Sequence, residues 1–145
     1  AMNTPSSNST QDSGIAGCLG AWVAGLSLDQ VPEEVLHITR RCIADTISVA
    51  VAGSRTPVAL RMRDHVSTQY GSEPSSLLGT SDSASAPGAA LANGVSAHAL
   101  DFDDTSYAGV VHGSAIVLPA VLAVGEQANV SGADFLEAFV AGSEA

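Results

Sequence analysis

The sequence contains no lysine, and charged residues of either sign make up only 14% of its 145 residues. Its five basic residues, all arginine, face fifteen acidic ones, so the formal net charge is −10 at pH 7. Phosphate backbones and anionic lipid surfaces repel such a chain, which makes nucleic acid and membranes poor partners. The same charge disfavours an anionic substrate, unless cations come from residues that this chain lacks.

Cysteines and long apolar runs are also scarce. Cys18 and Cys42 are too few for a disulfide framework or a metal-binding pattern, and both lie in apolar helical stretches, so we expect buried, reduced thiols. The longest apolar run, 115–125, is too short to span a bilayer and contains Pro119. The N-terminal residues lack the basic start and apolar core of a secretory signal, so we expect a soluble, cytoplasmic protein.

Helical periodicity dominates the rest of the chain. Residues 1–13 are rich in Ser, Thr and Asn and are expected to form a disordered lead-in, whereas residues 14–145 are expected to form one incomplete, all-α helical domain. The pattern predicts six helices, with a brief extended segment at Leu77–Leu78. The expected helices cover residues 15–26, 32–53, 57–70, 87–98, 114–128 and 131–145.

Two of these predicted helices carry further signals. The fifth is apolar nearly all round and contains Pro119, so we expect it to be buried and kinked. The sixth begins at Ser131 with Asp134 three residues later, a variant of the capping box. It is still periodic and apolar at Ala145, so we expect the chain to be the N-terminal part of a longer protein.

The most informative segment is the acidic cluster Asp101, Asp103 and Asp104, which lies between small, apolar flanks and is followed by His112. Three carboxylates in four residues repel one another unless they face water, bind a cation or share protons. The pattern therefore indicates a pocket rim at a helix end, with His112 available to exchange protons. The alternative is that Asp101 and Asp104 only cap helices and His112 fills a hydrogen-bonded turn.

Asp101, Asp103 and Thr105 also fit the DxDxT motif of haloacid-dehalogenase-like, Mg²⁺-dependent phosphatases. That chemistry needs the motif to leave the end of a buried β-strand near the start of its domain. Here some ninety residues of helical pattern come first, and the preceding residues are not β-branched. The context argues against a phosphatase.

The same segment resembles the MmgE/PrpD family, which includes 2-methylcitrate dehydratase, cis-aconitate decarboxylase and iminodisuccinate epimerase. The resemblance is centred on 92–105, His112-Gly113-Ser114 and 117–120, and it runs from about Ile15 to the last residue in the family's order. It implies a helical bundle that is the N-terminal part of the family's helical domain, without the family's second, α/β domain. It also implies a homodimer that acts on small di- or tricarboxylates without a metal or redox cofactor.

The resemblance further implies roles for individual residues. Asp101 and His112 would transfer and orient protons, and Thr105 would bind a substrate carboxylate. His98 and Asp104 would line the substrate site mainly by positioning the others. The lysine and the further histidine that the family uses would lie beyond residue 145.

The chain departs from the family pattern after the acidic motif. It has His112-Gly113-Ser114 where members often have His-Pro-Ser, and an apparent one-residue insertion within 106–111. That loop is also more apolar than usual, which puts tricarboxylate specificity in doubt. We expect a lyase that performs dehydration or decarboxylation; the alternatives are an epimerase of the same family and a non-catalytic helical fragment or dimerisation module.

Overall fold

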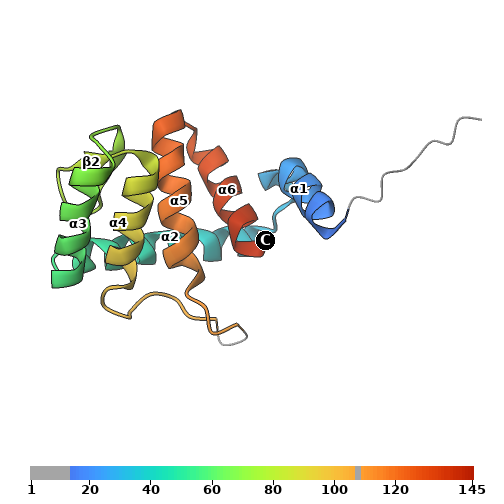
Figure 1. Cartoon of the computed structure of the whole chain (residues 1–145). Helices are drawn as coiled ribbons and strands as arrows, with labels where there is room; N and C mark the ends of the chain where they lie inside the picture. The colour runs from blue at the N-terminus through green and yellow to red at the C-terminus, as the bar shows by residue number, and fades with distance from the viewer. Residues whose placement is uncertain (1–13, 107–108) are drawn as a thin grey trace, which may run out of the picture.

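The computed structural model describes residues 14–106 and 109–145 (Figure 1). The lead-in predicted over 1–13 lies outside the described residues. In the described part the chain is almost entirely helical, with one two-stranded sheet, so the predicted all-α bundle is confirmed. In chain order the elements are α1 (Ile15–Gly25), the 3₁₀ turn η1 (Leu28–Gln30), α2 (Glu33–Gly53), α3 (Pro57–Gln69), β1 (Ser75–Ser76), β2 (Ser83–Ala84), α4 (Ala86–His98), α5 (Gly113–Ala128) and α6 (Gly132–Glu144).

Four helices stand side by side in the order α3, α4, α5, α6, and the long helix α2 crosses the row (Figure 1). Local signals set where these helices begin. Thr56 caps α3 by accepting a hydrogen bond from the Ala59 backbone at 3.4 Å, and Pro57 occupies the first turn. Ser131 and Asp134 form the predicted capping box of α6. These caps fix the register of each helix relative to its apolar face.

A short β-hairpin closes one side of the row. The sequence predicts an extended segment at Leu77–Leu78, and the structure has it two residues earlier, at β1. This strand pairs antiparallel with β2, which the sequence pattern did not predict. The buried side chain of Asn93 in α4 holds this hairpin: its Oδ1 accepts from the Leu78 backbone at 2.8 Å and its Nδ2 donates to the Ser76 carbonyl at 2.8 Å. Asn93, part of the motif that resembles the family, is therefore a structural residue.

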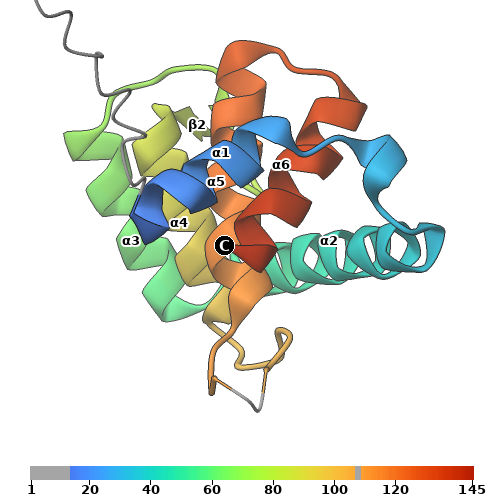
Figure 2. The same cartoon turned by 90° about the vertical axis from the view of Figure 1, so that its right-hand side faces the viewer.

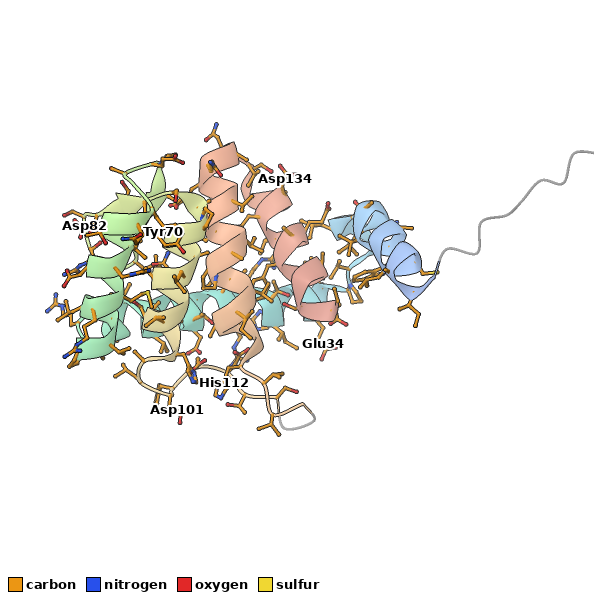
Figure 3. The ribbon with its side chains drawn as sticks, in the orientation of Figure 1. Glu34, Tyr70, Asp82, Asp101, His112 and Asp134 are labelled. Carbon is orange, nitrogen blue, oxygen red and sulfur yellow. The ribbon has the colours of Figure 1, made fainter. Side chains whose placement is uncertain are left out.

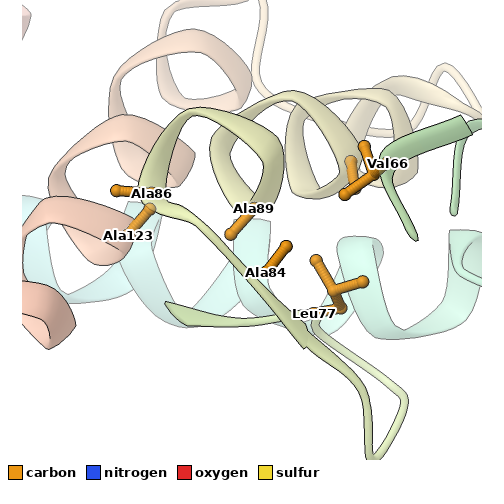
Figure 4. Packing of buried hydrophobic residues seen from close by; sticks show 7 residues of the cluster. Val66, Leu77, Ala84, Ala86, Ala89 and Ala123 are labelled. Atoms are coloured by element: carbon orange, nitrogen blue, oxygen red, sulfur yellow. The ribbon is translucent and has the colours of Figure 1, made fainter. Parts of the chain in front are cut away.

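The core is made largely of small side chains. Around Val66 and Leu77 gather alanines of α4, β2 and α5, among them Ala92. Figure 4 shows the others in the cluster (Ala84, Ala86, Ala89, Ala123). Small residues let helix backbones approach closely, so packing depends on the absence of side-chain atoms as much as on their presence. At the crossing of α2 and α4, a Cβ added to Gly53 would overlap the Ser96 carbonyl oxygen.

Two expectations about burial are wrong. The fifth predicted helix, α5, buries only one face, because Ile116 and Val124 on its other side are 69% and 57% exposed. Cys18 is exposed and Cys42 is half-buried, although neither forms a disulfide. The cause for Cys18 is the position of α1, which stands outside the row, beyond α6 in Figure 1 and in front of the other helices in Figure 2. No residue among Ile15–Gly25 is buried.

Helix α5 continues through Pro119, which is buried. Within the ranges that the structure describes, each helix is too short or too polar to cross a membrane.

Candidate active site

The predicted site residues lie on and beside the loop that joins α4 to α5, at the lower ends of these two helices in Figure 3. Figure 3 shows Asp101 and His112 together there, whereas Asp134 lies at the opposite end. The loop turns sharply because Asp101 adopts φ +51°, a left-handed conformation that Asp tolerates better than most residues. Its backbone N–H donates to the His98 carbonyl at 3.0 Å, which ends α4 and leaves the carboxylate 81% exposed at the loop surface.

Asp103 has the opposite environment, since its side chain is completely buried. The His98 Nδ1 atom lies 3.1 Å and 3.2 Å from its two carboxylate oxygens in a forked hydrogen bond. The His112 Nδ1 atom lies 3.2 Å from Oδ2 of the same carboxylate. One buried acid therefore meets the same nitrogen of two histidines, one at the end of α4 and one at the start of α5.

The two imidazoles form an edge-to-face pair whose centroids are 4.6 Å apart. On its outer side, His112 Nε2 lies 3.9 Å from Asp101 Oδ1, and Thr105 Oγ1 lies 3.5 Å from His112 Nδ1. The structure thus brings His98, Asp101, Thr105 and His112 into one cluster, with Asp103 beneath them. A cluster with histidines and carboxylates in contact is chemically equipped to accept and return protons.

Asp104 faces away from this cluster. Its carboxylate accepts from the Ser114 backbone N–H at 3.1 Å and from the Ser114 hydroxyl at 2.6 Å. These bonds satisfy donors in the first turn of α5 and place negative charge at the positive end of the helix. For Asp104, the capping alternative drawn from the sequence therefore describes the observed contact.

Asp104 also acts on Cys42 of α2. Burial raises the pKa of the Cys42 thiol above its ordinary value of 9.0, and the nearby negative charges of Asp104 and Asp45 raise it further. Arg41 and a hydrogen bond with Ser114 oppose that shift. The charge of Asp104 on the loop thus acts on a side chain of α2. The raised pKa favours the neutral, unreactive thiol of Cys42.

The segment with the apparent insertion begins and ends beside the cluster. Ser106 and Val111 pair as an antiparallel bridge, with backbone hydrogen bonds of 2.9 Å and 3.3 Å. Residues 107–108 of this segment lie outside the described ranges. Between the loop and the helices is a groove of about 580 Å³ that contains both imidazoles and is lined otherwise by small or apolar residues (Ala90, Leu91, Gly94, Val95, Val110, Val111, Ala115, Ile116).

A cation would also fit among these side chains. Ligand atoms of His98, Asp101, Asp103 and His112 all lie within 4.8 Å of one another. The contacts of the two rings with Asp103 account for that spacing without an ion, because the Nδ1 atom of each ring already lies within 3.2 Å of a carboxylate oxygen of Asp103. No orphaned buried polar side-chain atom within the described ranges calls for a further ligand.

The context that a DxDxT phosphatase needs is missing from the described residues. The motif follows helix α4, and the single sheet of that part of the chain is the hairpin β1–β2. Asp103, which would be the acid/base of that motif, is buried under two histidines.

The sequence predicted a site on this loop, but Asp103 was not among the expected site residues. Its signal was present: His98 and Asp103 are five residues apart across a helix end, where a turn brings a side chain back to the last helical residue. The burial that gives Asp103 its significance could not be anticipated, because it depends on how α5 packs against α4.

Comparisons with known proteins bear on this site. The family model described as the MmgE/PrpD N-terminal domain matches residues 18–145. Cis-aconitate decarboxylase of Aspergillus terreus is 28% identical over 151 aligned residues, which cover 99% of this chain. The human and mouse cis-aconitate decarboxylases are 33% and 31% identical, each over 84% of this chain.

The chain spans only 26–30% of the length of these curated relatives. The family match itself covers almost all of the described residues, including Asp101, Asp103 and His112. The chain therefore belongs to the MmgE/PrpD family and corresponds to its N-terminal domain.

Proposed function

We propose that this chain forms one wall of the active site of an MmgE/PrpD-type lyase that acts on a small di- or tricarboxylate. The reaction would be dehydration or decarboxylation, driven by proton transfer at a carbon next to a carboxylate. Family membership and the relatives named cis-aconitate decarboxylase support the enzyme class. The observation that carries the proposal is the pairing of His112 Nε2 with Asp101 Oδ1, 3.9 Å apart beside an open groove.

In this proposal Asp101 and His112 are the proton-transfer residues. Removing or returning a proton beside a carboxylate creates a carbanion-like stage, and a base held next to the carbon lowers that barrier. Thr105 is exposed beside His112 and would donate a hydrogen bond to a substrate carboxylate. His98 would line the groove, and Asp104 would support the site by holding the start of α5.

The substrate's negative charges need partners that this groove lacks. No arginine is among the described residues that line it, although Arg41 lines a separate groove with Asp45 and Asp104. We propose that the compensating cations come from polypeptide that lies across the groove, in an incomplete domain completed by further chain. The apolar wall of Leu91, Val111 and Ile116 would contact the hydrocarbon part of the substrate.

The test compares Asp101→Asn and His112→Gln in the polypeptide that carries this domain, with cis-aconitate and related small carboxylates as substrates. We expect turnover to fall by roughly 10²–10⁴-fold in each variant, the usual contribution of a positioned acid or base. Consumption of substrate can be followed by proton NMR, and circular dichroism reports whether the fold is intact.

Matched controls come from α3, where Asp64→Asn and His65→Gln make the same chemical changes outside the loop. These variants should keep wild-type turnover. Near-normal turnover in both Asp101→Asn and His112→Gln would show that the loop is not the catalytic wall.

Two alternatives remain part of the proposal. An epimerase of the same family would use the same carbanion-like stage, and it would exchange substrate protons with deuterated water without releasing water or CO₂. A non-catalytic helical or dimerisation module would release nothing and exchange nothing. The expected homodimer and cytoplasmic location also stay proposals, and light scattering on the purified protein tests the first.

A further inference from the structure

Asp103 is the only one of the three clustered acids whose carboxylate is fully buried, and it meets two ring nitrogens. Burying a carboxylate is costly unless hydrogen-bond donors or cations surround it. Two Nδ1 atoms lie within reach of it: that of His98 at 3.1 Å in a hydrogen bond, and that of His112 at an N···O ion-pair distance of 3.2 Å. The environment of Asp103 therefore favours a proton on each of these nitrogens.

The second histidine has competing neighbours, and distance decides between them. A lone pair on His112 Nδ1 would face the buried Asp103 oxygen at 3.2 Å, whereas Asp101 lies 3.9 Å from Nε2 and is 81% exposed. Charges interact more strongly at shorter distance and away from water, so Asp103 outweighs Asp101. Thr105 Oγ1, 3.5 Å from His112 Nδ1, can accept from an Nδ1–H group or donate to an unprotonated Nδ1, so this contact favours neither tautomer.

We propose that Asp103 is a positioning residue that holds both His98 and His112 in the Nδ1–H tautomer. Each neutral ring then has its unprotonated Nε2 free to accept a proton, and on His112 that atom faces Asp101. His98 is thereby prepared in the same way as His112, as a second base of the pair. The catalytic meaning of this arrangement rests on the proposed function, but the tautomers themselves do not.

Long-range ¹H–¹⁵N correlation spectra of the imidazoles test this directly. The 145-residue chain is labelled with ¹⁵N and treated with EDTA, and spectra are recorded at a pH at which the rings are neutral. Single His→Gln variants assign the four histidines, with His37 and His65 as references outside the loop. We expect both His98 and His112 to carry the proton on Nδ1; an Nε2–H tautomer for either ring overturns the proposal.

The variant Asp103→Asn sharpens the test. An amide replaces one carboxylate oxygen by a donating NH₂ group and removes the negative charge, so a ring nitrogen that meets the NH₂ group is favoured in its unprotonated form. We expect at least one of the two rings to change to the Nε2–H tautomer. The matched control Asp134→Asn, at the far end of α6, should leave both tautomers unchanged (Figure 3).

Unchanged tautomers in a folded Asp103→Asn variant would overturn the proposal and leave Asp103 as a packing residue. If that variant does not fold, the wild-type spectra alone decide. Because these spectra require no turnover, the proposal about Asp103 can fail while the proposed lyase function stands, and the reverse.

Discussion

Asp101, Asp103 and Asp104 have the same side chain and nearly the same place in the sequence, yet three different surroundings. The first is exposed beside His112, the second is buried beneath two imidazoles, and the third holds Ser114 at the start of α5. A carboxylate's chemistry follows its solvation and its partners. The three acidic residues are therefore one carboxylate that faces solvent, one that orients two histidines and one that caps a helix.

Cys42 gives a prediction at this scale. Its thiol pKa is raised by burial first and by Asp104 second, so the thiolate is less populated at any given pH than in an unfolded chain. In a Cys18→Ser background at pH 8, we expect iodoacetamide to alkylate Cys42 more slowly in the folded protein than in the urea-unfolded protein. The rate should rise with a midpoint above pH 9.0, the ordinary thiol value.

The raised pKa of Cys42 also makes the stability of the fold depend on pH. Because the folded state favours the neutral thiol, its contribution to stability is complete below the ordinary pKa and is lost as the pH rises through the raised folded value. Replacing Asp104 by Asn should lower the midpoint of alkylation. A midpoint that is the same in folded and unfolded protein would contradict the assignment.

Among the helices, the crossing of α2 and α4 depends on Gly53. Its Cα lies against the backbone of Ser96, where even a methyl group would overlap the carbonyl oxygen. Gly20 in α1 has no neighbouring atom within 4 Å of an added Cβ. Gly53 is the last residue of α2 and Gly20 lies in the middle of α1, so Gly20 reports the effect of helix propensity at a position without packing contacts.

We expect Gly53→Ala to destabilise the protein by roughly 1–3 kcal/mol or more, because the backbones must separate to admit the methyl group. Gly20→Ala should be neutral or stabilising by up to about 1 kcal/mol, the difference in helix propensity between the two residues. Urea denaturation followed by circular dichroism measures both. Equal effects of the two substitutions would mean that the crossing is not close-packed.

Considered as a whole molecule, the described chain is a packed row of helices with one poorly attached member. Among Ile15–Gly25 no residue is buried, and the segment that follows is held by a hydrogen bond from the Leu28 backbone to Glu137 of α6 at 3.1 Å. Apolar residues of α1, including Ile15 and Trp22, are 91% and 42% exposed. Few buried contacts mean a low free energy of local opening.

Hydrogen exchange measured by mass spectrometry should show this difference. We expect amides of 15–25 to exchange many-fold faster than those of 86–98 in α4, whose helix contacts α2, α3 and α5. The exchange rate of the amides around Ser143, near the C-terminal end of α6, provides a comparison at another helix end. Equal protection of α1 and α4 would show that α1 is anchored by contacts that the isolated chain does not display.

Local chemistry was sufficient to predict the helices and the loop on which we propose the site. Pro57, Pro87 and the Ser131–Asp134 pair act within one helical turn, and their effects can be read from neighbouring residues. The family resemblance, carried by the segment around Asp101, indicated the function class in the same way. None of these inferences required knowledge of distant contacts.

Packing between distant segments decided the rest. Asp103 is buried because α5 returns beside α4, Cys18 is exposed because α1 lies outside the row, and β1 found in β2 a partner that its own residues do not specify. Periodicity shows that one face of a helix is apolar, but not which element covers that face, because burial depends on how two elements pack against each other. For that reason the sequence located the acidic cluster, and only the tertiary structure distinguished its three aspartates.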